Sequence, residues 1–180
     1  MKKGFSILLL LVLCNFKVFA QNAYIQKETV LLAIPTYEAK LKNVSEQQQQ
    51  YSNEIKQDRT HLQKKVNSLA GPYNPQAQEA FSQLKKRMKP TDTLKLNLLL
   101  EEDKALTKKE ETYNAIIKEE YQNKIQPLLD KLNIIIKQYA SKQNLDAIYV
   151  LEQIQPAMVY INPKRIITND IIEIVKKEFK

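Results

Sequence analysis

The chain has 180 residues, of which 28 are lysine or arginine, 20 are acidic and only two are glycine. So few glycines exclude the glycine-rich phosphate loops of P-loop and dinucleotide-binding proteins, and they argue against all-β sandwiches and barrels, whose turns use glycine. One histidine and one cysteine exclude zinc sites built from clusters of these residues. With 43% hydrophobic residues the chain can bury a core, and its composition predicts a mainly helical protein with few tight turns.

The first 20 residues have the pattern of a signal peptide. Two lysines stand near the start, residues 5–13 form a short apolar stretch, and Ala20 supplies the small residue before a cleavage site. We therefore expect cleavage between Ala20 and Gln21 and export of the mature chain. Two alternatives stay open: a buried helix start, and a lipoprotein signal at Cys14, although a leucine precedes this cysteine where such signals have a small residue.

The mature chain begins with short elements and continues into a long helix. Residues 22–26 are typical of a strand, and residues 28–33 of one or two helical turns that end before Pro35. From residue 37, apolar residues recur at alternating spacings of four and three, the pattern of a narrow seam between two helices. The seam residues are Tyr37, Leu41, Val44, Tyr51, Ile55, Leu62 and Leu69, and the polar residues in the remaining seam positions are Gln48, Asp58 and Lys65.

A segment with glycine and proline interrupts this helix. It is a candidate hinge, with the alternative that it is only a tolerated irregularity, and its key residues are Gly71, Pro72 and Pro75. Asn74 is expected to cap a second helical stretch that starts at Pro75. The tip of the structure is expected at about residues 89–93, where Asp92 or Thr93 caps the return helix.

The return helix is expected over residues 94–142. Its first part is weakly patterned because Asp103 and Glu110 occupy seam positions, whereas residues 121–139 keep the alternating spacing. Pro127 should kink the helix or cost it a hydrogen bond. Two arms of nearly equal length joined by a tight turn predict a long antiparallel helical hairpin.

A small β part is expected at the base of this hairpin. Residues 147–151 and 157–161 are rich in β-branched and aromatic side chains, and a Gln-Pro pair separates them, which predicts a β-hairpin. Thr168 is expected to cap a final helix over residues 169–179. About three short strands are marginal alone, so we expect strands of several subunits to join. The candidate oligomer strands contain Tyr24, Ile25, Ile148, Val150, Val159 and Ile161.

The order of these elements resembles that of the Skp/OmpH family of periplasmic chaperones. Residues 121–132 are similar to the family's Tyr-x-x-Pro-Ile-x-x-Lys-Ile run, and residues 140–151 to its Gly-Tyr-Asp-x-Val-Leu-Asp strand entry. Residues 167–172 look like the family's Asp-Ile-Thr helix start, and residues 34–37 fit its N-terminal pattern. No motif of the family covers residues 71–93. The sequence departs from the family pattern at Gln26, Gln143, Asn144, Glu152 and Ile166.

The resemblance implies a homotrimer in the periplasm. The strands of three chains would form a small β-barrel body, and three helical hairpins would surround a cavity that holds unfolded outer-membrane proteins without ATP. The expected fold class is therefore mainly α with a small β part that trimerisation completes. The expected divisions are a signal peptide (1–20), a β-rich body with a C-terminal helix (21–35 plus 143–180) and a helical tentacle (36–142).

The expected tip of the tentacle is basic. Its positive residues fall within five positions and are Lys85, Lys86, Arg87 and Lys89. They are candidate contacts for anionic lipid head groups or acidic clients, and the plainer interpretation is a solvated helix face. Nucleic acid is not an expected partner, because no basic surface interleaved with aromatic residues is evident.

No constellation of nucleophile, base and oxyanion donor is evident, so we expect neither an enzyme nor a cofactor. His61 has no partner at motif spacing and is expected on the helix surface. The acidic residues at 101–103 and 110–111 are expected to pair with nearby lysines along the helix. The alternative function is structural: a coiled-coil spacer of the cell envelope with one folded partner.

Overall fold

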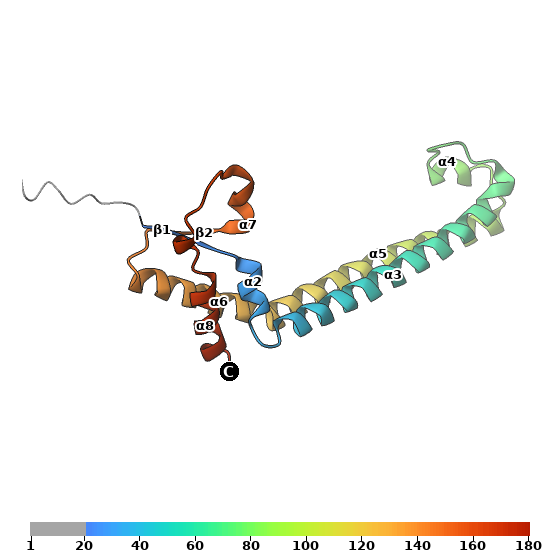
Figure 1. Cartoon of the computed structure of the whole chain (residues 1–180). Coiled ribbons are helices and arrows are strands. Elements are labelled where there is room, and N and C mark those ends of the chain that lie inside the picture. Colours follow the sequence, from blue (N-terminus) through green and yellow to red (C-terminus); the bar gives the residue numbers. More distant parts are fainter. Residues whose placement is uncertain (1–20) are drawn as a thin grey trace, which may run out of the picture. The chain divides into compact units, whose positions relative to one another are not determined.

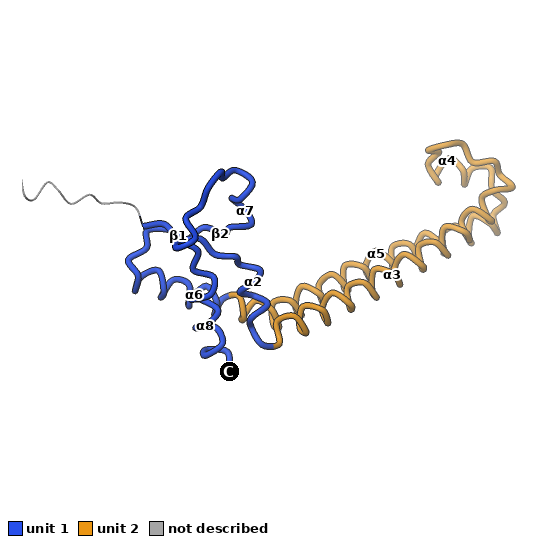
Figure 2. Tube along the Cα trace, in the orientation of Figure 1, with its two compact units in different colours: residues 1–35, 130–180 blue, residues 36–129 orange. Residues whose placement is uncertain are grey.

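The computed structural model describes residues 21–180, so the predicted signal peptide lies outside the described residues. The expectation of a mainly helical fold with a small β part is confirmed: long helices accompany one sheet of two parallel strands (Figure 1). The described residues divide into two compact units, 21–35 with 130–180, and 36–129 (Figure 2). Within residues 21–180 no helix has the length and apolar character needed to cross a membrane.

Two long helices make up most of the second unit: α3, Tyr37–Ala70, and α5, Pro90–Lys124. Lys109 of α5 contacts Glu54 of α3, whereas Glu102, earlier in α5, contacts Lys65, later in α3. The two helices therefore lie side by side and run in opposite directions (Figure 1). Their buried side chains are few and widely spaced: Val44, Ile55, Leu62 and Ala70 on α3, and Leu96 and Leu106 on α5.

Ion pairs between α3 and α5 occupy the seam positions that lack apolar side chains. Arg59 bonds Glu110 at 2.8 Å and Asp103 at 3.5 Å, and Lys65 bonds Glu102 at 2.9 Å. The expected pairing along the helix is confirmed for Glu101, which bonds Lys104 at 2.7 Å. The acidic residues named above instead pair with cations of α3, because α3 offers cations at the same level. Polar residues thus continue the seam where its hydrophobic pattern stops.

A second cluster lies closer to the start of α3. The ammonium group of Lys109 bonds Glu54 at 2.6 Å and Asp58 at 2.8 Å, and the rings of Tyr51 and Tyr113 stack with centroids 3.9 Å apart. The Tyr113 hydroxyl donates to Glu54. Hydrogen bonds from Lys109 and Tyr113 lower the pKa of the Glu54 carboxyl, and the two carboxylates raise the pKa of Lys109. Glu54 and Lys109 therefore stay charged across the neutral range.

The return helix is interrupted near Pro127, as predicted. Helix α5 ends at Lys124, and α6 (Gln126–Lys142) begins two residues later with this proline in its first turn. Ile125, between the two helices, is fully buried. A proline lacks the N–H that a continuous helix needs and its ring clashes with the preceding turn, so the ladder restarts here.

The first unit is built around strand β1 (Asn22–Ile25), which was predicted at this position. It pairs in parallel with β2 (Ala147–Val150), in the register Asn22 to Ala147. On its other side the Tyr24 carbonyl accepts the Ile167 N–H at 2.9 Å. Helices α2 (Lys27–Leu32) and α8 (Thr168–Glu178) pack against each other and complete this unit. The buried apolar residues here include Ala23, Ile25, Val30, Ile171 and Val175.

The predicted β-hairpin over residues 147–161 is wrong. After β2 the chain turns directly into a short helix, α7 (Leu151–Ile154), followed by a turn of 3-10 helix that contains Pro156. Residues 158–161 form no strand, and Val159 is fully exposed. β2 bonds instead with β1, more than a hundred residues earlier, and a pairing at that sequence distance leaves no mark in local periodicity.

The predicted cap of the last helix is also wrong. Thr168 is the first residue of α8, and its hydroxyl accepts the N–H of Gln26 at 3.0 Å. In a similar way the Glu152 carboxylate of α7 accepts the N–H groups of Lys27 and Glu28, at the start of α2. Both side chains thus satisfy backbone donors from the other end of the chain, which ties the two termini of this unit together.

Replacing Thr168 with valine tests this bond, because valine keeps the shape of the buried side chain and removes the acceptor. The Gln26 N–H then loses its partner, and we expect the free energy of unfolding to fall by about 1–2 kcal/mol in urea titration. Thr168→Ser keeps the hydroxyl and serves as the control. Thr168→Ser should lose less stability than Thr168→Val, and an unchanged free energy of unfolding in Thr168→Val would contradict a stabilising role for the Gln26 bond.

Candidate functional site

The segment with the predicted tip residues is the distal turn, which we define as residues 71–89, between α3 and α5. It holds one turn of 3-10 helix (Gly71–Tyr73) and the short helix α4 (Phe81–Lys85). The prediction that Asn74 caps a helix starting at Pro75 is wrong. Asn74 adopts a left-handed conformation with φ 47°, and the chain remains non-helical until α4.

The two ends of the distal turn show why a glycine precedes Pro72 and why the expected cap of the return helix is wrong. Gly71 has helical angles (φ −47°, ψ −47°) directly before Pro72. A Cβ at such a position crowds the proline ring, so glycine lets α3 run up to the proline. At the other end Pro90 is the first residue of α5, and neither Asp92 nor Thr93 caps it. Proline is well suited to that position because its missing N–H has no acceptor there.

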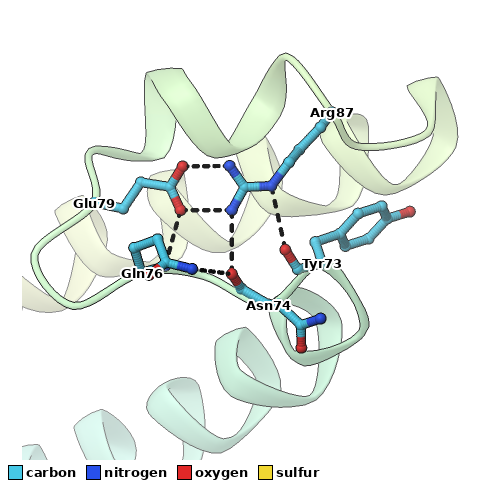
Figure 3. Close-up of polar contacts among 5 residues, drawn as sticks. All are labelled: Tyr73, Asn74, Gln76, Glu79 and Arg87. Atoms are coloured by element: carbon cyan, nitrogen blue, oxygen red, sulfur yellow. Dashed lines mark hydrogen bonds and ion pairs between the residues drawn. The ribbon is translucent and has the colours of Figure 1, made fainter.

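An arginine holds the distal turn together (Figure 3). The Arg87 guanidinium bonds the Glu79 carboxylate through two parallel contacts, of 2.5 and 2.7 Å. It also donates to the carbonyls of Tyr73 at 3.2 Å and Asn74 at 3.3 Å. The same carboxylate accepts the N–H of Gln76 at 3.1 Å. The side chain of Arg87 therefore links the two halves of the turn.

The electrostatics of the distal turn follow from this contact. Hydrogen bonds from Arg87 lower the pKa of the Glu79 carboxyl, whose side chain is only 10% exposed. The Tyr73 hydroxyl donates to Asp92 at 2.7 Å, which lowers the pKa of that carboxyl, and accepts the Lys89 N–H at 3.2 Å. The distal turn is thus a folded cap with internal polar bonds.

A small apolar cluster fills the distal turn beneath these bonds. Leu84 of α4 is 2% exposed and joins residues from the ends of both long helices. The buried members are Ala70, Leu84, Met88 and Leu96, and partly buried neighbours are Val66, Leu69, Tyr73 and Leu100. The cluster explains why five residues suffice to form α4, because the helix is stabilised by burial of one face and not by its own length.

The predicted basic residues do not behave alike. Arg87 is engaged in the bonds above, so it is not a free cation for a ligand. Lys86 and Lys89 are exposed and Lys85 is half-buried, and within residues 21–180 their ammonium groups form no ion pair. Sequence reasoning missed Glu79 as the partner of Arg87, because a separation of eight residues has no signature in a segment expected to be helical.

Elsewhere in the second unit, α3 and α5 border an open groove of about 440 Å³. Its lining mixes aromatic, aliphatic and charged side chains, and includes Tyr51, Ile55, Arg59, Glu110 and Tyr113. Leu94 and Leu98, one helical turn apart on α5, are 64% and 70% exposed. These parts of the second unit thus offer both apolar and charged side chains to solvent.

Other predicted residues lie as follows. His61 is exposed on α3, as expected. Among residues 21–180 no group of three or more histidine, cysteine, aspartate or glutamate side chains could hold a metal ion. Four of the six candidate residues for oligomer strands lie in strands, two in β1 and two in β2. Val159 and Ile161 do not.

Known proteins resemble this chain at the level of a family. The model of a family described as outer membrane protein (OmpH-like) matches residues 21–175. No individual curated protein matches the chain. The matched range includes segments of both compact units and the whole of the distal turn.

The bonds of Arg87 predict an acid-sensitive distal turn. Because the pKa of Glu79 is lowered in the folded state, the stabilisation from this pair is present above the carboxyl's unfolded pKa and disappears as the pH falls through the lowered value. Arg87→Lys cannot make two parallel bonds and also reach both carbonyls. We expect faster amide hydrogen exchange at residues 73–87 in this variant at neutral pH, while α3 is unchanged.

Lys86→Ala is the matched control, since this side chain is exposed and forms no ion pair among the described residues. Its exchange should equal that of the parent protein. If Arg87→Lys also left exchange in the distal turn unchanged, the arginine would not hold the turn.

Proposed function

Since the chain belongs to the family described as outer membrane protein (OmpH-like), we propose that it is a periplasmic chaperone that binds unfolded outer-membrane proteins and prevents their aggregation without ATP. The family match, which includes segments of both compact units, is the observation that carries this proposal. The predicted signal peptide supports export to the periplasm, where ATP is not expected to drive the binding and release of clients.

The surface of the second unit supports this role. A chaperone that only holds its client needs many weak contacts and no deep pocket, because the client must later be released. The open groove between α3 and α5 and the exposed Leu94 and Leu98 provide apolar contact area, and nearby charges keep this area soluble. Lys85, Lys86 and Lys89 offer attraction to acidic clients or to an anionic membrane surface.

The first unit supports assembly into a homotrimer. Its sheet has only two strands, which is marginal for an independent fold. Val159 and Tyr160 are exposed at 106% and 75%, beside an apolar depression lined in part by Leu151, Met158 and Ile161. Pairing of this segment with another subunit would cover it. Three antiparallel α3–α5 hairpins could then surround a client cavity.

The second candidate is an envelope scaffold that uses the helix pair as a spacer. The dense ion pairs between α3 and α5 favour it, since they suit a stiff rod. Capture from envelope extract separates the two functions: many unfolded outer-membrane β-barrels support the chaperone, and one folded partner supports the scaffold.

The chaperone proposal predicts suppressed aggregation. A urea-unfolded outer-membrane β-barrel protein, diluted into buffer without ATP, should scatter less light when stoichiometric amounts of the chain are present. Leu94→Ser combined with Leu98→Ser should weaken this effect, because both side chains are exposed and their loss removes client contacts with little effect on folding.

Asn97→Ser, on an exposed position of the same helix, is the control and should act like the parent chain. Sedimentation equilibrium on the same samples should give a trimer. Unchanged aggregation with the parent chain would reject the chaperone, and a stable monomer would remove the cavity.

A further inference from the structure

Gln21, the residue after the predicted cleavage site, is held at the edge of the first unit by Asp146. The Gln21 N–H donates to the carboxylate Oδ2 of Asp146 at 2.6 Å. In return the Asp146 N–H donates to the Gln21 carbonyl at 2.9 Å. The side chain and the backbone of Asp146 thus bond the N–H and the carbonyl of Gln21, respectively.

This contact continues the pairing of the sheet by one step. Asn22 pairs with Ala147 in the parallel register of β1 and β2, and Gln21 and Asp146 are the residues directly before them. β1 also bonds residues near α8 on its other side, through Tyr24. The contact between Gln21 and Asp146 therefore lies at the N-terminal end of β1.

We propose that signal-peptide cleavage converts this contact into an ion pair between the α-ammonium group of Gln21 and the Asp146 carboxylate, and that the pair protects Gln21 from cyclising to pyroglutamate. The proposal rests on the export proposed above. Cleavage turns a peptide N–H into an amino group whose pKa is ordinarily about 7.7–8.0. A carboxylate within hydrogen-bond distance favours the charged form of that group.

Cyclisation is the reaction that the ion pair opposes. The neutral α-nitrogen attacks the side-chain amide carbon of Gln21, a carbon–nitrogen bond forms, and the bond from that carbon to the amide nitrogen breaks. The amide nitrogen leaves as ammonia with a proton from the α-amine, and no oxidant or reductant takes part. A protonated amine has no free electron pair, so the Asp146 carboxylate slows the reaction by keeping the amine charged.

The size of the effect follows from exposure. Both Gln21 and Asp146 are exposed, so solvent screens the pair and its influence is that of a surface ion pair. Such pairs shift an equilibrium by about two- to fivefold. Loss of the carboxylate should therefore raise the rate of cyclisation by about the same factor. The lactam product keeps one N–H for Asp146 but has lost its charge.

The test uses the full mature chain, released from a fusion partner by a protease that leaves Gln21 as the first residue. Intact-mass measurement follows the loss of ammonia over time near neutral pH. Asp146→Asn should cyclise about two- to fivefold faster than the parent chain. Glu173→Gln removes one exposed carboxylate of the same unit and should cyclise at the parent rate. Equal rates in Asp146→Asn and the parent chain would overturn the proposal.

A second measurement needs no variant. Titration of the ¹⁵N-labelled α-amine by NMR should give a higher pKa in the folded parent chain than in the same chain in urea. An equal or lower pKa in the folded chain would overturn the ion pair even if Asp146→Asn failed to fold.

A third measurement identifies the first residue of the protein that cells export. A mature terminus at Gln21 supports the proposal, and any other terminus overturns it, while the aggregation assay above is unaffected by either. Absent chaperone activity together with a raised amine pKa would reject the proposed function alone.

Discussion

Charged contacts between α3 and α5 are the constraint on which the second unit depends. The two helices have few buried apolar residues for their length, so burial alone does not fix how one slides along the other. Arg59 between Asp103 and Glu110, and Lys109 between Glu54 and Asp58, do so because each cation meets carboxylates only in one alignment. Exposed ion pairs add little stability, but they penalise shifted alignments that bring like charges together.

This arrangement leaves the surface of the helix pair free for other contacts. A continuous apolar seam would have placed most of the hydrophobic side chains between α3 and α5. Here Leu94 and Leu98 remain exposed, and the groove near Tyr51 is open. The folded distal turn, held by Arg87, closes the end of the pair without a long mobile loop. Both features fit a surface that meets unfolded chains at many points and releases them.

The sequence predicted the elements that local pattern determines. The strand at 22–25, the helical start of α3, the break at Pro127 and the final helix all follow from apolar spacing and proline chemistry. The resemblance to the OmpH-like family was also visible in short motifs, and the family match confirms it. These signals are local, so one sequence suffices to detect them.

What could not be predicted depends on contacts between distant residues. β2 pairs with β1 across most of the chain, and Thr168 accepts a bond from Gln26, so the expected β-hairpin and helix cap were both wrong. In the distal turn the chain forms a loop after Pro75 where a helix was expected, and the bond between Arg87 and Glu79 holds this loop. Lone charges and hydroxyls carry no mark of such partners in the sequence.

The alignment of α3 on α5 can be measured with spin labels. Ser52 and Asn114 line the same groove from the two helices, so labels at these positions should give a short, narrow distance distribution by electron resonance. Arg59→Glu should lengthen and broaden the distribution, and replacing Asp103 and Glu110 with lysine in the same chain should restore it. A distribution that ignores the charge reversal would contradict the claim that ion pairs set the alignment.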